Sequence, residues 1–227
     1  TSYDMVKHLL VDEMQDYTPI QYAVLSKWFS CKKTILGDSN QSVNVYASTS
    51  LHDIKRVFPH ADTIELLKSY RSTLEIMGLA KRIHPGSTMI PVERHGEEPQ
   101  VIRCRDAREE LAFIQELSRH FLDSGLQTMG ILCKTSSQAR QVYESIRKLE
   151  GSVNLLDFSS DRFQDGITIT FAHMAKGLEF DQVIVPFADA ENYRSEMDRS
   201  LLYIACTRAM HKLSLTYSGE PAAWLAV

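Results

Sequence analysis

The chain has 227 residues, of which 44% are hydrophobic and 24% are charged, a composition typical of a globular protein and not of a disordered or fibrous one. Its length suits one large domain or two small ones. Acidic residues outnumber basic residues by 29 to 25, and the net charge of −4 argues against strong nonspecific nucleic-acid binding by the isolated chain, although a local basic strip stays open.

No segment is suited to span a membrane or to direct secretion. The longest apolar runs, such as Val183–Ala188 and Leu201–Cys206, have six residues, whereas a membrane-spanning helix needs roughly 20. The first residues lack the charged-then-apolar pattern of a signal peptide. The four cysteines form no Cys-x-x-Cys pair, so we expect reduced thiols, no structural metal site and a cytoplasmic protein.

Short apolar runs alternate with helical patterns, which predicts an α/β fold with a mostly parallel sheet and helices on both faces. We expect a break between two units at Phe58–Asp62, where Pro59 ends a helix, and a surface loop at His84–Pro99. In chain order, the pattern predicts a strand at Met5–Val11, a helix at Pro19–Phe29, a strand at Thr34–Leu36, a helix at Leu51–Phe58, a strand at Thr63–Leu67, a helix at Thr73–Ile83, a strand at Val101–Cys104, a helix at Arg108–Ser124, a strand at Met129–Cys133, a helix at Ser137–Leu149, strands at Ile167–Thr170 and Gln182–Val185, a helix at Asp198–Arg208 and a strand at Leu213–Thr216.

The first chemical signal is an apolar strand that runs directly into two adjacent carboxylates, Asp12 and Glu13. Ligands bind at the carboxyl ends of strands in a parallel sheet. There Asp12 could hold Mg²⁺ and Glu13 could polarise a water for attack on a phosphate. Acidic pairs after strands are also common as solvated turns, so the pair alone does not decide between these readings.

Four further segments have the same ambiguity. Gly37–Gln41 follows a strand and is by itself a turn, because Gly and Asp favour turns. Tyr70-Arg71-Ser72 follows another strand, and a lone arginine is usually a surface charge. Thr168–Asp181 and Leu202–Ala209 also have purely structural explanations. His173 could be a hydrogen-bonded polar residue, Lys176-Gly177 could cap a helix, and Arg208 could be a cation that is favoured at the end of a helix.

The order of all five segments resembles the UvrD/Rep-like superfamily 1 helicases. The matching segments are Val11–Asp16, similar to the Walker B motif, Gly37–Ser42, similar to the third motif, Ser69–Ser72, similar to the fourth, Ala172–Asp181, similar to the fifth, and Leu202–Ala209, similar to the sixth. The match runs from residue 6 to about residue 217, and the last two motifs are long and specific.

The resemblance implies ATP and Mg²⁺ as cofactors and a role for each matching residue in the first unit. Asp12 would bind Mg²⁺ and Glu13 would be the general base. Gln15 and Gln41 would lie near the γ-phosphate of ATP and sense its loss.

In the second unit, the resemblance implies that Tyr70 stacks on the base of the nucleotide. Arg71 and Arg208 would approach the γ-phosphate as arginine fingers, since phosphoryl transfer depends on positioning and charge neutralisation. Glu179 would contact the ribose, and Gly177 would let the backbone come close.

Thr170 and His173 would face the track of a single DNA strand. By the same resemblance, residues 1–61 would be the C-terminal half of a first RecA-like domain, and residues 62–227 would be a complete second one. The protein would then be part of an ATP-dependent DNA helicase or translocase, and we expect a monomer.

Two departures from the family pattern stand out. The phosphate-binding loop Gly-x-x-x-x-Gly-Lys-Ser/Thr does not occur; in Gly130–Thr135 a cysteine, Cys133, precedes the lysine, and the segment reads as a strand that leads into a turn. We therefore expect a fragment that is inactive by itself. In addition, only 98 residues separate Arg71 from Thr170, too few for the large accessory domain of classical members.

The third motif also has an altered tail, Asn44–Ala47, in which Tyr46 could stack on a base and contribute roughly 1–3 kcal/mol. A buried tyrosine beside a turn is an equally good reading. These departures resemble the DNA helicase IV or HelD branch, which implies an alternative function as an ATP-driven factor that binds RNA polymerase.

Overall fold

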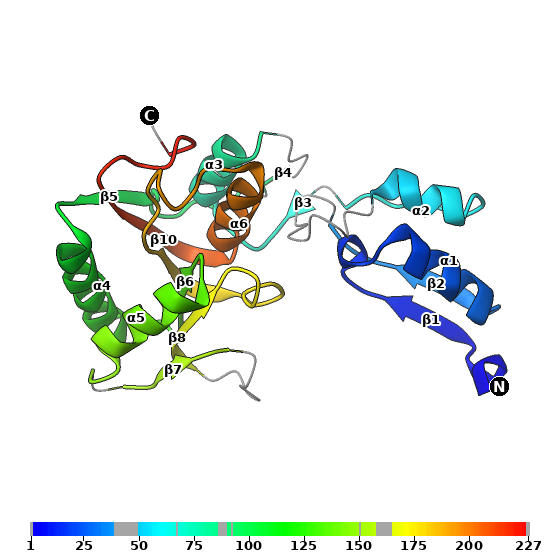
Figure 1. Cartoon of the computed structure of the whole chain (residues 1–227), viewed down its shortest axis with the longest axis horizontal. Helices are drawn as coiled ribbons and strands as arrows, with labels where there is room; N and C mark the ends of the chain where they lie inside the picture. Colours follow the sequence, from blue (N-terminus) through cyan, green and yellow to red (C-terminus); the bar gives the residue numbers. More distant parts are fainter. Residues whose placement is uncertain are drawn as a thin grey trace. The chain divides into compact units, whose positions relative to one another are not determined.

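The computed structural model describes residues 2–38, 50–66, 68–85, 90–91, 93–149, 151–157 and 165–225. The chain divides into two compact units, Thr1–Leu66 and Leu67–Val227, a boundary five residues later than the sequence suggests. Figure 1 colours the chain along its sequence, with unit 1 running from blue to cyan, and each unit is described by itself.

Unit 1 is built around two parallel strands and two helices. Strand β1 (His8–Val11) pairs with β2 (Lys32–Ile35), so that Val11 lies opposite Ile35. The strand begins three residues later than predicted, because Met5 is the last residue of a 3-10 helix, η1 (Ser2–Met5), and Val6 and Lys7 are in no regular element. A second 3-10 helix, η2 (Met14–Asp16), follows β1. Helices α1 (Pro19–Trp28) and α2 (Leu51–Val57) begin at capping boxes formed by Thr18 with Gln21 and by Ser50 with Asp53.

The core of unit 1 is small. Val11, Met14, Tyr22 and Ile54 are buried together, and the Tyr22 hydroxyl donates to the Met14 carbonyl oxygen at 3.0 Å. Because Met14 follows the Asp12-Glu13 pair directly, this packing fixes the backbone on which the two carboxylates stand.

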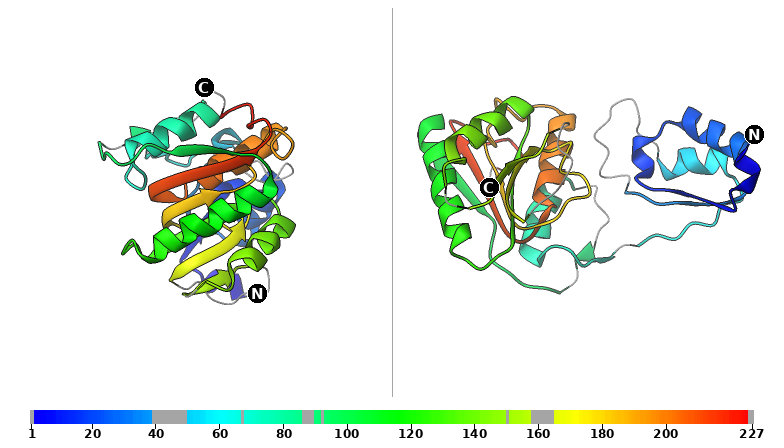
Figure 2. Two further views of the ribbon diagram at one scale, coloured as in Figure 1. Left: turned by 90° about the vertical axis from the view of Figure 1, so that its left-hand side faces the viewer. Right: turned by 90° about the horizontal axis from the view of Figure 1, so that it is seen from below.

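Unit 2 contains a six-stranded parallel sheet in the order β5-β10-β9-β6-β8-β7, which confirms the predicted α/β fold. Helices α4 and α5 cover one face and α3 and α6 cover the other (Figures 1 and 2). The bounds are β3 Lys68–Ser69, α3 Leu74–Ile83, β4 Ile90–Pro91, β5 Gln100–Cys104, α4 Ala107–Leu122, β6 Thr128–Cys133, α5 Ser136–Ile146, β7 Val153–Leu155, β8 Gly166–Phe171, β9 Phe180–Val185, α6 Glu196–Cys206 and β10 Ala209–Ser218.

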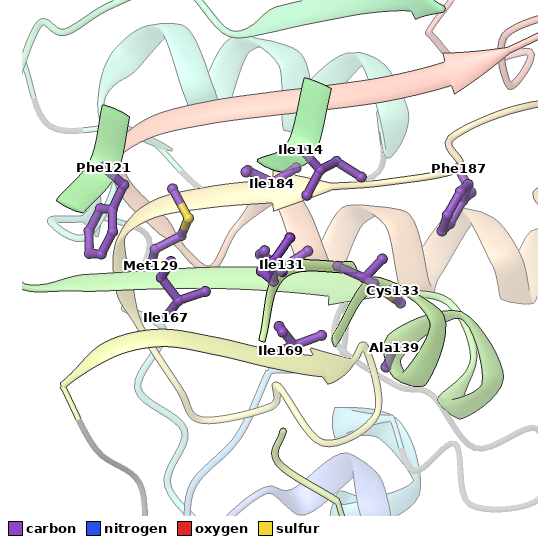
Figure 3. Close-up of a cluster of buried hydrophobic side chains, with 12 residues drawn as sticks. Ile114, Phe121, Met129, Ile131, Cys133, Ala139, Ile167, Ile169, Ile184 and Phe187 are labelled. Carbon is purple, nitrogen blue, oxygen red and sulfur yellow. The ribbon is translucent and has the colours of Figure 1, made fainter. Parts of the chain in front are cut away.

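The main core of unit 2 lies between the sheet and helices α4 and α5 (Figure 3). Alternate residues of β6 and of the first part of β8 point into it, as the strand period of two requires. The cluster includes Met129, Ile131 and Cys133 from β6, Ile167 and Ile169 from β8, Ile184 from β9, Ile114 and Phe121 from α4, and Ala139 from α5.

Gly130 points to the other face of β6, where a Cβ atom would lie 2.6 Å from the Phe180 ring. The glycine is therefore explained by packing, and the reading of Gly130–Thr135 as a strand that leads into a turn is confirmed.

One predicted strand is wrong. Ala61–Leu66 has no helix or strand, and Ile64 and Leu66 are 86% and 88% exposed. The alternation of apolar residues fits a strand, but no strand in the described part of the chain pairs with this segment. Among the helices that the structure describes, none combines the length and the apolar character needed to cross a membrane.

Candidate active site

In unit 1, the loops that follow β1 and β2 are joined at the carboxyl edge of the two strands. The Leu36 N–H donates to the Val11 carbonyl and the Met14 N–H donates to the Leu36 carbonyl, both at 2.8 Å. Gly37 lies so close to η2 that a Cβ atom would be 2.5 Å from the Met14 nitrogen. Only glycine fits there, so the backbone at Gly37 can lie directly against the loop that follows β1.

Gln15 is the buried link between these two loops. Its Nε2 donates to Glu13 Oε2 at 2.7 Å, and its Oε1 accepts the Asp38 N–H at 3.1 Å. Glu13 itself has a left-handed backbone with φ 54°, which is uncommon for a residue with a side chain. Asp12 is exposed and its Oδ1 accepts the Glu13 N–H at 2.8 Å. The structure thus brings Asp12, Glu13 and Gln15 together.

The donor set at Asp12 suits a magnesium ion that arrives with a phosphate group. Mg²⁺ prefers oxygen ligands, and in nucleotide sites it typically takes one or two carboxylates and completes its shell with phosphates and water. Across the described residues, no group of three or more His, Cys, Asp or Glu side chains is arranged to hold a metal unaided. Gln41 and Tyr46, the other predicted residues of unit 1, lie outside the described residues.

In unit 2, three of the predicted segments meet at the start of β9 and β10. Arg71 Nε forms an ion pair with Glu179 Oε1. The Ser72 hydroxyl donates to the Ala209 carbonyl at 2.6 Å, and the Phe180 N–H donates to the Arg208 carbonyl at 3.0 Å. The fourth, fifth and sixth motifs are therefore fastened to one another by direct contacts.

The nucleotide contacts expected of Tyr70 and Gly177 are sterically open. The Tyr70 side chain is 71% exposed, as an aromatic ring must be to stack on an incoming base. Gly177 has a left-handed backbone with φ 79°, and a Cβ atom there would meet no atom within 4 Å.

Arg208 is almost fully buried, with 1% exposure, at the turn between α6 and β10. Its Nε donates to the Ile204 carbonyl at 3.2 Å and its Nη2 to Thr207 Oγ1 at 3.4 Å. The guanidinium therefore lies against the last turn of α6, where the carbonyl ends of a helix favour a cation.

Thr170 and His173, the predicted strand contacts, are placed differently. Thr170 is buried and its Oγ1 donates to the Leu156 carbonyl at 2.8 Å, which fastens the segment after β7 to β8. His173 is exposed, with its ring centre 6.4 Å from that of Phe171. The structure therefore brings only His173 of the two to the surface.

Comparisons with known proteins match both units. Residues 3–61 match the UvrD/REP helicase N-terminal domain, and residues 167–216 match the UvrD-like helicase C-terminal domain. The crystal structure of the C-terminal domain of a possible DNA helicase from Lactobacillus plantarum superimposes with a TM-score of 0.59 and 31% identity, over 70% of this chain and 92% of that one.

Three curated relatives have informative names. The ATP-dependent DNA helicase UvrD2 of Mycobacterium tuberculosis is 39% identical over 85 residues, 35% of this chain and 12% of the relative. PcrA of Staphylococcus aureus, an ATP-dependent DNA helicase, is 28% identical over 155 residues, 63% and 21% of the two chains. A putative ATP-dependent DNA helicase of Acanthamoeba polyphaga mimivirus is 25% identical over 259 residues, 99% and 36% of the two chains.

The chain spans between 12% and 36% of the length of these three relatives. Two of them are named UvrD2 and PcrA and the third is a putative DNA helicase, and none of these names supports the helicase IV or HelD branch that the departures suggest. With both of its units matched by the family and its fold shared with a helicase C-terminal domain, the chain belongs to the UvrD/Rep-like superfamily 1 helicases.

Proposed function

We propose that the chain supplies the ATP-coupling residues of a UvrD-like DNA helicase or translocase. The observation that carries the proposal is the convergence in unit 2, where Arg71 pairs with Glu179 while Ser72 and Phe180 bond the backbone of the Arg208-Ala209 segment. Residues up to 137 positions apart in sequence are held together by these bonds, around side chains with the chemistry of a nucleotide site.

In unit 1, Asp12 is the proposed magnesium ligand and Glu13 the proposed general base. Bound Mg²⁺ would neutralise charge on the phosphates of ATP. Glu13 would accept a proton from the attacking water at a carboxylate oxygen, and the Gln15 amide, 2.7 Å from Glu13 Oε2, orients that carboxylate. Gln15 also bonds the Asp38 N–H, so a change at the phosphate would reach the loop after β2.

In unit 2, Arg71 and Arg208 are the proposed cations for the transferring phosphate, with Tyr70 against the base and Glu179 on the ribose. The Arg208 guanidinium donates to two neutral oxygens, and an anionic phosphate oxygen is a stronger acceptor than either. We infer that Arg208 exchanges these partners for a phosphate during the reaction.

For DNA, His173 is the proposed contact that the structure leaves on the surface, and Tyr46 is the proposed stacking residue. Thr170 would act indirectly, by holding the segment after β7 against β8. The alternative of an RNA-polymerase factor is not developed further, because the relatives named above are DNA helicases.

The proposal is tested by measuring ATP hydrolysis in a fusion that joins this chain behind the phosphate-binding loop segment of a UvrD-like relative. Single-stranded DNA should stimulate phosphate release, and the unfused chain should release none measurably. A folded fusion that binds nucleotide but hydrolyses no ATP with or without DNA would contradict the proposal. Matched circular dichroism spectra establish that the fusion is folded.

A further inference from the structure

A short segment, Glu93–Glu97, contacts the backbone of Arg71 and of Leu74, and we call it the strap. The Leu74 N–H donates to the Arg94 carbonyl at 2.8 Å, which ties the strap to the first turn of α3. Glu75 holds it a second time, because its Oε2 accepts the Gly96 N–H at 2.9 Å and its Oε1 lies 2.8 Å from His95 Nδ1. These bonds lower the pKa of Glu75 to about 2.

Close packing fixes the strap at its centre. A Cβ atom on Gly96 would lie 2.5 Å from Thr73 Cγ2, so the backbone of the strap lies directly on the N-cap residue of α3. The strap therefore has a defined position next to the Tyr70–Ser72 segment, and its side chains are available to act on that segment.

Arg94 is the side chain of the strap that reaches the site. Its Nη1 donates to the Arg71 carbonyl oxygen at 3.2 Å. On the other side of the same peptide segment, the Ser72 hydroxyl donates to the Ala209 carbonyl at 2.6 Å. Two hydrogen bonds, one at the Arg71 carbonyl and one from the Ser72 hydroxyl, thus hold this backbone segment, and they fix the position of the Arg71 Cα atom.

The other terminal nitrogen of the Arg94 guanidinium, Nη2, contacts the imidazole of His211. Nη2 lies 2.7 Å from His211 Nδ1 and 3.2 Å from His211 Nε2, so the guanidinium contacts the imidazole at both of its ring nitrogens. His211 Nε2 in turn lies 3.8 Å from Asp181 Oδ1, two residues after Glu179. Asp181 is anchored, because its Oδ2 accepts the N–H groups of Gln127 and Thr128 at 2.9 and 3.0 Å.

We propose that Arg94 is a positioning residue that braces the Arg71–Glu179 ion pair from behind, through the Arg71 carbonyl on one side and through His211 and Asp181 on the other. Arg94 is separated from Arg71 by the whole of α3, and nothing in the spacing of the family motifs assigns it a role. The importance of the brace for phosphate transfer rests on the proposed function, whereas its effect on the ion pair does not.

The strap provides a matched control. Lys212 Nζ lies 2.8 Å from Glu97 Oε1, at the other end of the strap. Lys212→Met removes a charged contact of the strap and leaves the side chains of Arg71, Arg94 and His211 unchanged. If the strap served only to hold the fold together, Lys212→Met and Arg94→Met should have similar consequences.

The test is an NMR measurement on the full chain, with the Nε–H signal of Arg71 as the readout. The ion pair with Glu179 should protect that proton from exchange with water. We expect Arg94→Met to accelerate the exchange by about tenfold, the size expected when a hydrogen bond of a charged group is lost, and Lys212→Met to leave it unchanged. Arg94→Lys, which keeps the charge but has one nitrogen, should also accelerate it, because one nitrogen does not reach both partners.

Arg94→Lys keeps the experiment decisive if the methionine variant does not fold. Unchanged Arg71 exchange in folded Arg94→Lys or Arg94→Met would overturn the proposal, as would equal acceleration in Lys212→Met. No nucleotide is present in this measurement, so a failure of the proposed ATP chemistry would be seen separately in the hydrolysis assay of the fusion.

Discussion

Arg208 illustrates how a residue can be assigned by motif and still be found in an unexpected environment. The motif predicts a cation that acts on a phosphate, whereas the structure buries the guanidinium against Ile204 and Thr207. The proposed exchange of partners during the reaction would reconcile the two descriptions, and this makes the substitution of Arg208 informative.

Arg208→Ala in the fusion should lower ATP turnover by about 1,000-fold or more, because the charge acts mainly as negative charge develops on the transferring phosphate. Nucleotide affinity should change far less. Since Arg208 is 1% exposed, alanine also leaves a cavity, and Arg208→Lys serves as the control that keeps the charge and much of the volume. Turnover of Arg208→Ala close to that of the parent fusion would show that the assigned role is wrong.

Two glycines give a paired prediction for stability. Gly37→Ala places a Cβ atom 2.5 Å from the Met14 nitrogen and should destabilise unit 1 by about 1–3 kcal/mol, as overpacking does. Gly78, in the middle of α3, has no atom within 4 Å of a built Cβ, so Gly78→Ala should stabilise unit 2 by about 0.5–1 kcal/mol.

Urea unfolding measures both changes, with Trp28 as the fluorescence probe in unit 1 and Trp224 in unit 2. Equal effects of the two substitutions on their units would contradict the packing described for Gly37.

At the scale of elements, the sequence predicts the long, patterned pieces and misses the short ones. Helix α4 and strands β6, β8 and β9 lie within a few residues of their predicted bounds, because their apolar periodicity is set by the core that they share. Strands β3 and β4 have two residues each and β7 has three, too few for any period to be read.

The candidate site, too, can be predicted from the sequence only in part. Asp12, Glu13, Arg71 and Glu179 are predictable from their motifs, but the buried partners are not. Gln15 is an exception, since the motif includes it, yet its bond to the Asp38 N–H depends on the approach of β2. Arg94 has no motif, and only the folded chain brings it to the Arg71 carbonyl.

Glu110 on α4 is a buried carboxyl group that accepts two hydrogen bonds, and its burial predicts that the stability of unit 2 depends on pH. Its Oε1 accepts the Phe187 N–H at 2.7 Å and the Thr216 hydroxyl at 2.6 Å, while no partner is seen for the buried Oε2 among the described residues. Burial raises the pKa of Glu110 above its usual 4.5. The folded state therefore keeps the proton at a pH where the unfolded state has lost it, so this residue's contribution to stability falls as the pH rises above 4.5.

Glu110→Gln keeps the accepting Oε1 and cannot ionise. The free energy of unfolding of unit 2 should therefore depend less on pH in the variant, and the variant should gain stability relative to the parent chain as the pH rises from 4.5 toward neutral. Urea titrations followed by Trp224 fluorescence at several pH values measure this. Parallel profiles for the two proteins would show that Glu110 does not titrate differently in the folded state.

For the whole molecule, the charge balance predicts weak DNA binding by the chain alone. Because the net charge is −4, single-stranded DNA should bind feebly at physiological salt. His173 is an exposed proposed contact, so His173→Ala should weaken binding further at low salt. A fluorescence titration tests this. Submicromolar binding that survives high salt would contradict it, since phosphate contacts weaken steeply with salt.

The central proposal is that Glu13 and Arg71 both take part in ATP hydrolysis. Its most direct test is the rate of DNA-stimulated ATP hydrolysis in the fusion for Glu13→Gln, Arg71→Ala and the double variant. Each single change should lower turnover by at least about 100-fold, and the double variant should be little slower than the slower single one, because residues that act as a unit are not additive. Near-normal turnover in either folded single variant would contradict the claim.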